Sequence, residues 1–147
     1  MASLLTLTFS APTQQLAKGE VLVTQGDHGG DLYVLESGRL IVARDGVDIA
    51  AIEAPDSLIG EMAVLLGKAH TATVRADRDS RVRVIADARH LLERQPGIAL
   101  QVATLLCARL DATSALVAEL SQSPTEKPAG QGFFGRLVSA LAGGPSR

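Results

Sequence analysis

Short apolar runs separated by turn sequences occupy the first half of the chain. Residues 4–9 alternate leucine and phenylalanine with threonine, which is the period of a half-buried strand. Glycine and aspartate stand between the later runs, and both residues tolerate the backbone conformations of tight turns. Strands at this spacing predict an antiparallel roll or jelly roll over residues 4–86. The further runs lie at residues 20–25, 31–36, 39–44, 47–52 and 81–85.

The period of the pattern changes after Ala86 from two residues to three or four. Asp87 is a candidate N-cap for a helix over residues 88–95, and Pro96 either interrupts that helix or begins the next one. A second helix is predicted from residue 97 to about residue 122, because apolar residues and one threonine recur there at helical spacing. These residues are Val102, Leu105, Leu106, Leu110, Thr113, Leu116, Val117 and Leu120.

That apolar stripe is more than about six helical turns long, and its length indicates whether the chain forms a dimer. A helix that only covered a small β-roll would need a shorter apolar face. We therefore expect the helix over residues 97–122 to cover the β core and also to form a seam with the same helix of a second copy. The sequence thus predicts a homodimer.

The last part of the chain differs in composition from the rest. Residues 121–132 are rich in proline, glycine and serine, which predicts a flexible linker. Residues 133–147 predict either a short apolar helix or a disordered end. A helix here would either fold back on the domain or make residues 133–142 an anchor for a protein partner or a membrane surface, the latter disfavoured by a single basic residue, Arg136. Its apolar face would consist of Phe133, Phe134, Leu137, Val138 and Leu141.

Composition predicts one domain over residues 1–120. The chain has 147 residues, 46% of them hydrophobic, which is enough for a core without disulfides. A formal net charge of -2 gives no general attraction to nucleic acid, so no nucleic-acid partner is expected. The single cysteine, Cys107, excludes a disulfide within the chain and is expected to be a small buried hydrophobe. We see neither a signal peptide nor an apolar run near the ~20 residues of a membrane span, and expect a cytoplasmic protein.

Candidate chemistry gathers in residues 59–76. Gly60 and Glu61 open a short apolar run there, and a small-residue turn containing His70 leads into a β-branched strand. Backbone N–H groups at a glycine turn and a helix start suit an anion, and a carboxylate accepts hydrogen bonds from hydroxyl groups. The stretch therefore predicts a pocket for a sugar phosphate.

The chain shows no pattern typical of a catalytic or metal site. The three histidines, His28, His70 and His90, include no His-x-His pair, and no serine stands in a strand-turn-helix elbow. We therefore expect no enzyme activity, no metal and no obligatory cofactor.

Seven short motifs occur in order along the domain, and their series identifies a family. They are Lys18-Gly19-Glu20-Val21-Leu22, Gln25-Gly26-Asp27, Leu32-Tyr33-Val34-Leu35, Ser37-Gly38, Asp45-Gly46, Gly60-Glu61-Met62-Ala63-Val64-Leu65 and Thr71-Ala72-Thr73-Val74. The series resembles the cyclic-nucleotide-binding domain family, which includes bacterial catabolite activator proteins and regulatory subunits of protein kinase A. The resemblance covers about residues 16–120 and implies a mainly β fold, an eight-stranded antiparallel β-roll followed by two helices over residues 87–122.

The resemblance also implies a phosphate-binding cassette at residues 60–73. Glu61 would bind the ribose 2′-hydroxyl, and Leu65 would couple the cassette to the helices that follow. Thr113 and Ser114 stand where the dimer helix of catabolite activators meets the adenine, one hydroxyl coming from each subunit. The cyclic phosphate would be lined by the backbone amides of Gly60, Met62, Ala63, Thr71 and Ala72.

His70 departs from the family pattern, in which an arginine neutralises the phosphate at this place. Arginine offers a permanent charge and a fork of donors, whereas an imidazole, with a reference pKa of ~6.5, is largely neutral at cytoplasmic pH. Losing a charge-assisted pair of this kind costs about 1.5–3 kcal/mol, which is roughly a ten- to hundred-fold loss of affinity. Lys68 is a nearby cation that can partly compensate.

Three functions follow as alternatives. The first is a sensor of cAMP, with cGMP less favoured, that signals through protein contacts. The second is a dimeric interaction module that keeps the fold and has lost the ligand, and the third is a sensor of a different anionic ligand. We expect no DNA binding, because the 27 residues after Leu120 are too few for the DNA-binding domain that catabolite activators carry.

Overall fold

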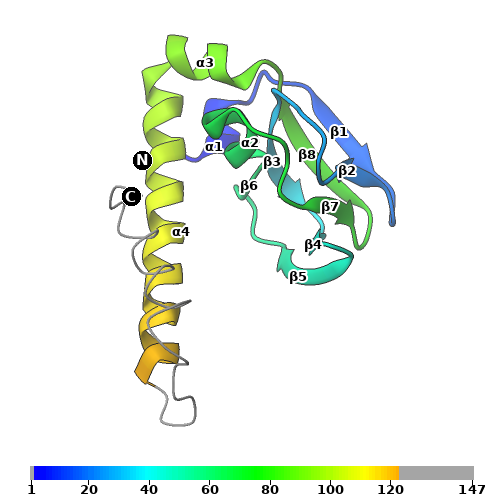
Figure 1. The fold of residues 1–147 in the computed structure, drawn as a ribbon. Helices are drawn as coiled ribbons and strands as arrows, with labels where there is room; N and C mark the ends of the chain where they lie inside the picture. The colour runs from blue at the N-terminus through cyan, green and yellow to red at the C-terminus, as the bar shows by residue number, and fades with distance from the viewer. Residues whose placement is uncertain (1, 123–147) are drawn as a thin grey trace. The chain divides into compact units, whose positions relative to one another are not determined.

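The computed structural model describes residues 2–122 of the protein. The chain divides into two compact units, Met1–Val102 and Ala103–Arg147, with the boundary inside the last helix. The elements (Figure 1) are, in chain order, α1 (Leu4–Leu7), β1 (Thr13–Leu16), β2 (Val21–Val23), β3 (Leu32–Ser37), β4 (Leu40–Arg44), β5 (Val47–Ile52), β6 (Leu58–Ile59), α2 (Glu61–Leu66), β7 (Thr73–Ala76), β8 (Ser80–Ile85), α3 (Ala88–Arg94) and α4 (Pro96–Gln122).

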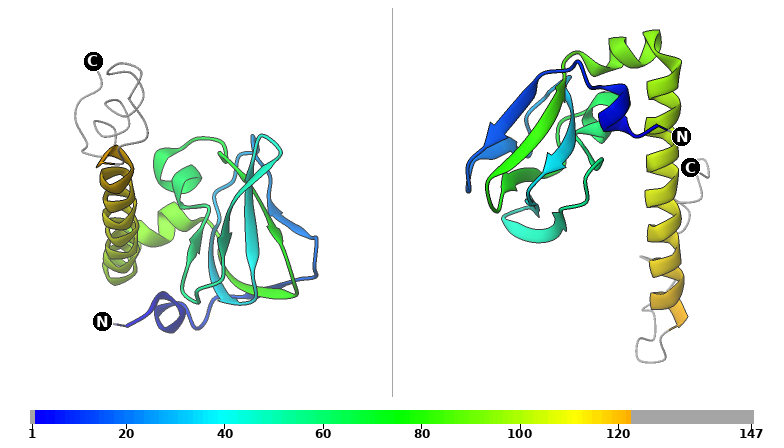
Figure 2. Two further views of the ribbon diagram at one scale, coloured as in Figure 1. Left: turned by 90° about the horizontal axis from the view of Figure 1, so that it is seen from below. Right: turned by 180° about the vertical axis from the view of Figure 1, so that it is seen from behind.

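Two four-stranded antiparallel sheets make up most of the first unit. The strand order is β1-β8-β3-β6 in one sheet and β2-β7-β4-β5 in the other. Figure 2 shows β1 and β8 side by side, as their pairing of Thr13 with Arg83 requires. Eight antiparallel strands followed by helices confirm the predicted β-roll.

The core of this unit is a cluster of aliphatic side chains drawn from both sheets. In β3 and β4 consecutive aliphatic residues on opposite faces are buried, and the side chains on the face between the sheets join this cluster. Each of these residues is less than about a tenth exposed. They are Leu16, Val23, Leu35, Leu40, Ile59, Val74, Ala76 and Val82.

Residues 4–9 do not form the predicted strand, and this part of the sequence prediction was wrong. Residues 4–7 fold as the helix α1, because the Ser3 hydroxyl caps the helix by accepting the Thr6 N–H at 3.2 Å. Asp56 adds an acceptor for the Leu5 N–H at 2.8 Å. Phe9, which a half-buried strand would place inward, is 79% exposed. The first strand of the roll is instead β1, at Thr13–Leu16.

The helices after the roll follow the predicted order, with one local difference. Asp87 stands at the N-cap position of α3, but its backbone is left-handed and its side chain makes no capping bond. Its own N–H donates to Asp31 Oδ1 at 3.2 Å. Pro96 begins α4, which confirms one of the two predicted alternatives. Proline suits the first helical position, because the N–H that it lacks would have no acceptor inside the helix.

The helix α4 runs to Gln122, two residues into the segment predicted as a linker. The rest of that linker and the predicted tail over residues 133–147 lie outside the described residues. Cys107 is exposed in the chain, so the expectation that it is buried was wrong. By length and composition alone, α4 is long and apolar enough to cross a membrane, whereas no membrane span is predicted from the sequence.

Candidate ligand-binding site

The candidate site begins where β6 ends and α2 starts. Gly60 lies between them with a left-handed backbone at a φ of 87°, a conformation in which glycine avoids the strain of other residues. A β-carbon at this position would lie 3.1 Å from the carbonyl oxygen of Asp31. The sequence therefore needs glycine here to turn the chain into the helix against the start of β3.

The first turn of α2 presents the predicted carboxylate and amides. Glu61 and Ala63 are buried, at 6% and 5% exposed, whereas Met62 on the other side of the helix is 47% exposed. The intrahelical pattern starts with the Val64 N–H, which donates to the Gly60 carbonyl at 3.2 Å. Helix geometry leaves the N–H groups before it without an acceptor inside the helix, and such groups suit an anion.

His70 is held beside this helix start by a pair of backbone hydrogen bonds. Its N–H donates to the carbonyl of Asp27 at 2.8 Å, and its carbonyl accepts the N–H of Gly26 at 2.9 Å. The imidazole Nε2 lies 3.0 Å from the point where a β-carbon at Gly29 would stand. Its Cε1 lies 3.7 Å from the corresponding point at Gly60. The imidazole therefore lies close to two glycines, one from the turn before β3 and one from the start of α2.

The loop after His70 carries the other two predicted residues. Thr71 and Ala72 are half-buried and lead directly into β7. At the start of that strand, Thr73 Oγ1 accepts the Gln25 N–H at 2.9 Å. Hydrogen bonds at His70 and Thr73 therefore tie the loop on both sides to residues 25–27, the turn after β2.

The structure brings together only part of the predicted site. Gly60, Glu61, Met62 and Ala63 are consecutive, and the His70 imidazole lies next to Gly60. Thr113 and Ser114 are exposed on α4 in the second unit. The Thr113 hydroxyl donates to the Arg109 carbonyl at 2.8 Å, within its own helix. The predicted contact of Thr113 and Ser114 with adenine stays a prediction.

Sequence reasoning missed two residues at this site. At Gly29 a β-carbon would stand 3.0 Å from the imidazole of His70, and Tyr33 Cδ2 lies 3.7 Å from the β-carbon point at Gly60. Burial raises the pKa of the Tyr33 hydroxyl above its usual value, and the negative charge of Asp31 raises it further. Tyr33 is the only tyrosine of the chain and interrupts an aliphatic strand, which was the available signal.

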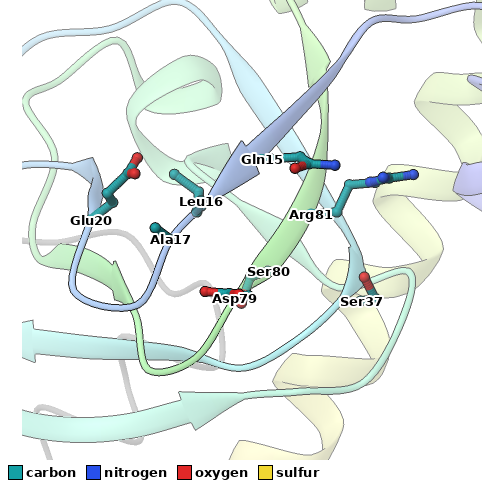
Figure 3. A pocket seen from close by; sticks show the side chains of 8 residues that line it. All are labelled: Gln15, Leu16, Ala17, Glu20, Ser37, Asp79, Ser80 and Arg81. Carbon is teal, nitrogen blue, oxygen red and sulfur yellow. The ribbon is translucent and has the colours of Figure 1, made fainter.

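A cavity of about 420 Å³ lies elsewhere in the first unit (Figure 3). It contains none of the predicted site residues. Its charged groups are two carboxylates, Glu20 and Asp79, and one guanidinium, Arg81. Asp79 Oδ1 accepts the Lys18 N–H at 3.2 Å. Since carboxylates outnumber the cation, the cavity does not suit a phosphate. Its lining residues are Gln15, Leu16, Ala17, Glu20, Ser37, Asp79, Ser80 and Arg81.

The family model for the cyclic nucleotide-binding domain matches residues 13–93. The lysophospholipase nte1 of Neurospora crassa is 28% identical over 117 residues, which are 74% of this chain and 8% of that protein. The regulatory subunit of cAMP-dependent protein kinase from Yarrowia lipolytica is 40% identical over 58 residues, 40% of this chain and 15% of that protein.

Among solved structures, the catabolite activator protein of Thermus thermophilus is similar, with a TM-score of 0.65 and 26% sequence identity. That similarity covers 80% of this chain and 59% of the solved chain. Because the chain spans only 8% of the lysophospholipase, the activity in that protein's name does not carry over. Since the family model covers more than half of the chain, from β1 to near the end of α3, the protein belongs to the cyclic nucleotide-binding domain family.

Proposed function

We propose that this chain is a regulatory module that binds a cyclic nucleotide at residues 60–73 and passes the binding event on through protein contacts. The family match over residues 13–93 includes the whole of that stretch. The similarity to a regulatory subunit of a cAMP-dependent kinase supports cAMP as the first ligand to test. The observation that carries the proposal is the meeting of Gly60, Glu61 and His70 at one place in a chain of this family.

The chemistry of these groups suits the two polar parts of a cyclic nucleotide. The Glu61 carboxylate can only accept hydrogen bonds, so it suits the ribose hydroxyl. Backbone N–H groups at the start of α2 and around Thr71 can only donate, so they suit the cyclic phosphate. The imidazole of His70 adds a donor between these two sets.

Calorimetric titration with cAMP and cGMP tests the proposal on wild type and on Glu61→Gln. The amide keeps the shape of Glu61 and removes its charge, so we expect the dissociation constant for cAMP to rise by about ten-fold or more. Glu53→Gln is the matched control, because Glu53 is an exposed carboxylate after β5, outside the site, and should leave binding unchanged. Wild-type protein that shows no heat with either nucleotide would contradict the proposal.

A ligand-free interaction module is the second candidate function. One observation favours it: the group beside the start of α2 is an imidazole and not the guanidinium of responsive relatives. Absence of heat with both nucleotides, together with a stable assembly in solution, would support this candidate over the first.

We further propose that the output of the module is a dimer seam on α4. The apolar stripe predicted over residues 97–122 lies on a continuous helix, and Leu110, Leu116 and Leu120 are 42%, 59% and 59% exposed. Exposed leucines at helical spacing favour packing against the same face of a second copy. Residues 133–142 remain the proposed anchor for a further protein partner.

A further inference from the structure

The imidazole of His70 lies beside the start of α2, with Cε1 3.7 Å from the point where a β-carbon at Gly60 would stand. Its backbone is fixed on both sides by hydrogen bonds to Gly26 and Asp27. A β-carbon at Gly29 would stand 3.0 Å from Nε2 of its ring. His70 itself is half-buried, so part of the residue is open to solvent.

We propose that His70 makes binding at this site depend on protonation, so that the module responds to a cyclic nucleotide and to pH together. This inference rests on the proposed function, since it concerns the same ligand. A cyclic phosphodiester keeps its negative charge throughout the neutral range. Only the charged imidazolium can give it a charge-assisted hydrogen bond, which is stronger than the bond from a neutral ring.

Other titratable or charged groups stand near His70 in the turn before β3, in β3, in α2 and in the loop after α2, and each could affect binding of an anion. Imidazole is the side chain whose charge changes between about pH 5 and pH 8 when its surroundings do not perturb it. The pKa of the Tyr33 hydroxyl is raised further from this range. The surrounding groups are Asp27 and His28 in the glycine turn, Asp31 and Tyr33 in and before β3, Glu61 in α2, and Lys68.

The sign of the effect follows from linkage. Binding of an anion favours the protonated ring, so the complex takes up part of a proton when it forms above the ordinary imidazole pKa of about 6.5. Affinity therefore falls as pH rises through the neutral range. From the usual difference between a charged and a neutral donor, we expect a fall of about 10- to 100-fold.

The test is calorimetric titration of the full chain with cAMP at about pH 5.5 and about pH 8, on wild type, His70→Gln and His70→Arg. We expect the wild-type dissociation constant to be at least about ten-fold larger at the higher pH, and both variants to change by less than about three-fold. His70→Arg should bind at the higher pH about as tightly as wild type at the lower. Titration in two buffers of different ionisation enthalpy should show proton uptake by wild type only.

His28→Gln is the matched control, because His28 is an exposed histidine in the neighbouring turn. It should keep the pH dependence of wild type, and a variant that loses it would assign the proton to His28 and overturn the inference. Saturable binding with equal affinity at the two pH values would overturn the inference and leave the proposed function standing. No heat from any of the proteins at either pH would overturn both. Thermal unfolding at each pH confirms that every variant is folded during titration.

Discussion

His70 shows how a single residue at this site depends on others that are distant in sequence. A β-carbon at residue 29 would crowd its ring at 3.0 Å, and the helix start beside it turns at Gly60, whose left-handed backbone favours glycine. The contact at Gly29 is tight, whereas a β-carbon at the adjacent Gly30 would meet nothing within 4 Å. The two neighbouring glycines therefore form a matched pair for experiment.

Gly29→Ala should displace the imidazole of His70, and Gly30→Ala should not. The new methyl group would stand 3.0 Å from Nε2, closer than carbon and nitrogen normally approach, and the ring is the part that can move. Neither glycine has a left-handed backbone, so alanine at each should change the free energy of unfolding by less than about 0.5 kcal/mol.

The measurement is the NMR signal of the His70 imidazole in the ligand-free protein. We expect its ring proton shifts to change in Gly29→Ala and to stay at wild-type values in Gly30→Ala. Weaker cAMP binding by the first variant alone would follow from the displaced donor. Identical ring signals in both variants would show that the contact with Gly29 does not hold the ring.

At the scale of elements, the sheet β2-β7-β4-β5 carries an ion pair that joins two strands across a third. The guanidinium of Arg75 in β7 donates to both carboxylate oxygens of Asp48 in β5, each at 2.8 Å, with β4 between them. The bond from Arg75 holds the pKa of the Asp48 carboxyl below its usual value. Because both side chains are largely solvated, the pair is sensitive to salt and contributes little.

The coupling between Asp48 and Arg75 should disappear in acid. A carboxyl group whose pKa is lower in the folded state stabilises that state at pH values above its unfolded pKa of about 3.9, and loses this contribution as pH falls through the folded value. A double-mutant cycle of Asp48→Asn and Arg75→Gln, read by thermal unfolding, should show coupling near pH 7 that vanishes near pH 2. Coupling that persists in acid would mean that packing, and not charge, joins the two residues.

At the scale of the whole molecule, the helix α4 carries leucines that stay exposed in the single chain, among them Leu110, Leu116 and Leu120. It is 27 residues long and begins in the first unit and ends in the second. The same length and composition would suit a membrane or a second copy of the helix. The charged residues Arg109, Asp111 and Glu119 on the helix favour an aqueous dimer seam over a lipid environment.

Leu116→Glu should dissociate the proposed dimer, because it would place a charge in an apolar seam. Ala115→Glu is the control, since Ala115 is exposed on the same turn but lies off the predicted stripe. Sedimentation of both variants should give the monomer mass for Leu116→Glu and the dimer mass for Ala115→Glu. Dimers of equal stability in the two variants would contradict a seam at these residues.

The chain's local patterns were sufficient for most of the fold but not for its first strand. Periods of two, glycine turns and a long helical stripe were visible in the sequence, and the order of motifs identified the family. The strand β1 has the sequence Thr-Gln-Gln-Leu and only Leu16 is buried, so its strand structure comes from pairing with β8 and not from its own pattern. Residues 4–9 had the pattern of a strand, but the cap at Ser3 and the Asp56 carboxylate stabilise a helix there.

For the candidate site, the chemical groups that could meet a ligand follow from the sequence alone. They are a carboxylate at Glu61, a glycine turn at Gly60, and at residue 70 an imidazole in place of a guanidinium. The proximity of the imidazole to Gly29 and to Gly60 is visible only in the folded chain. The reason is physical: backbone preference and hydrophobic period act over a few residues and can be read locally. A contact between residues 29, 60 and 70 exists only after two sheets have packed and their loops have met.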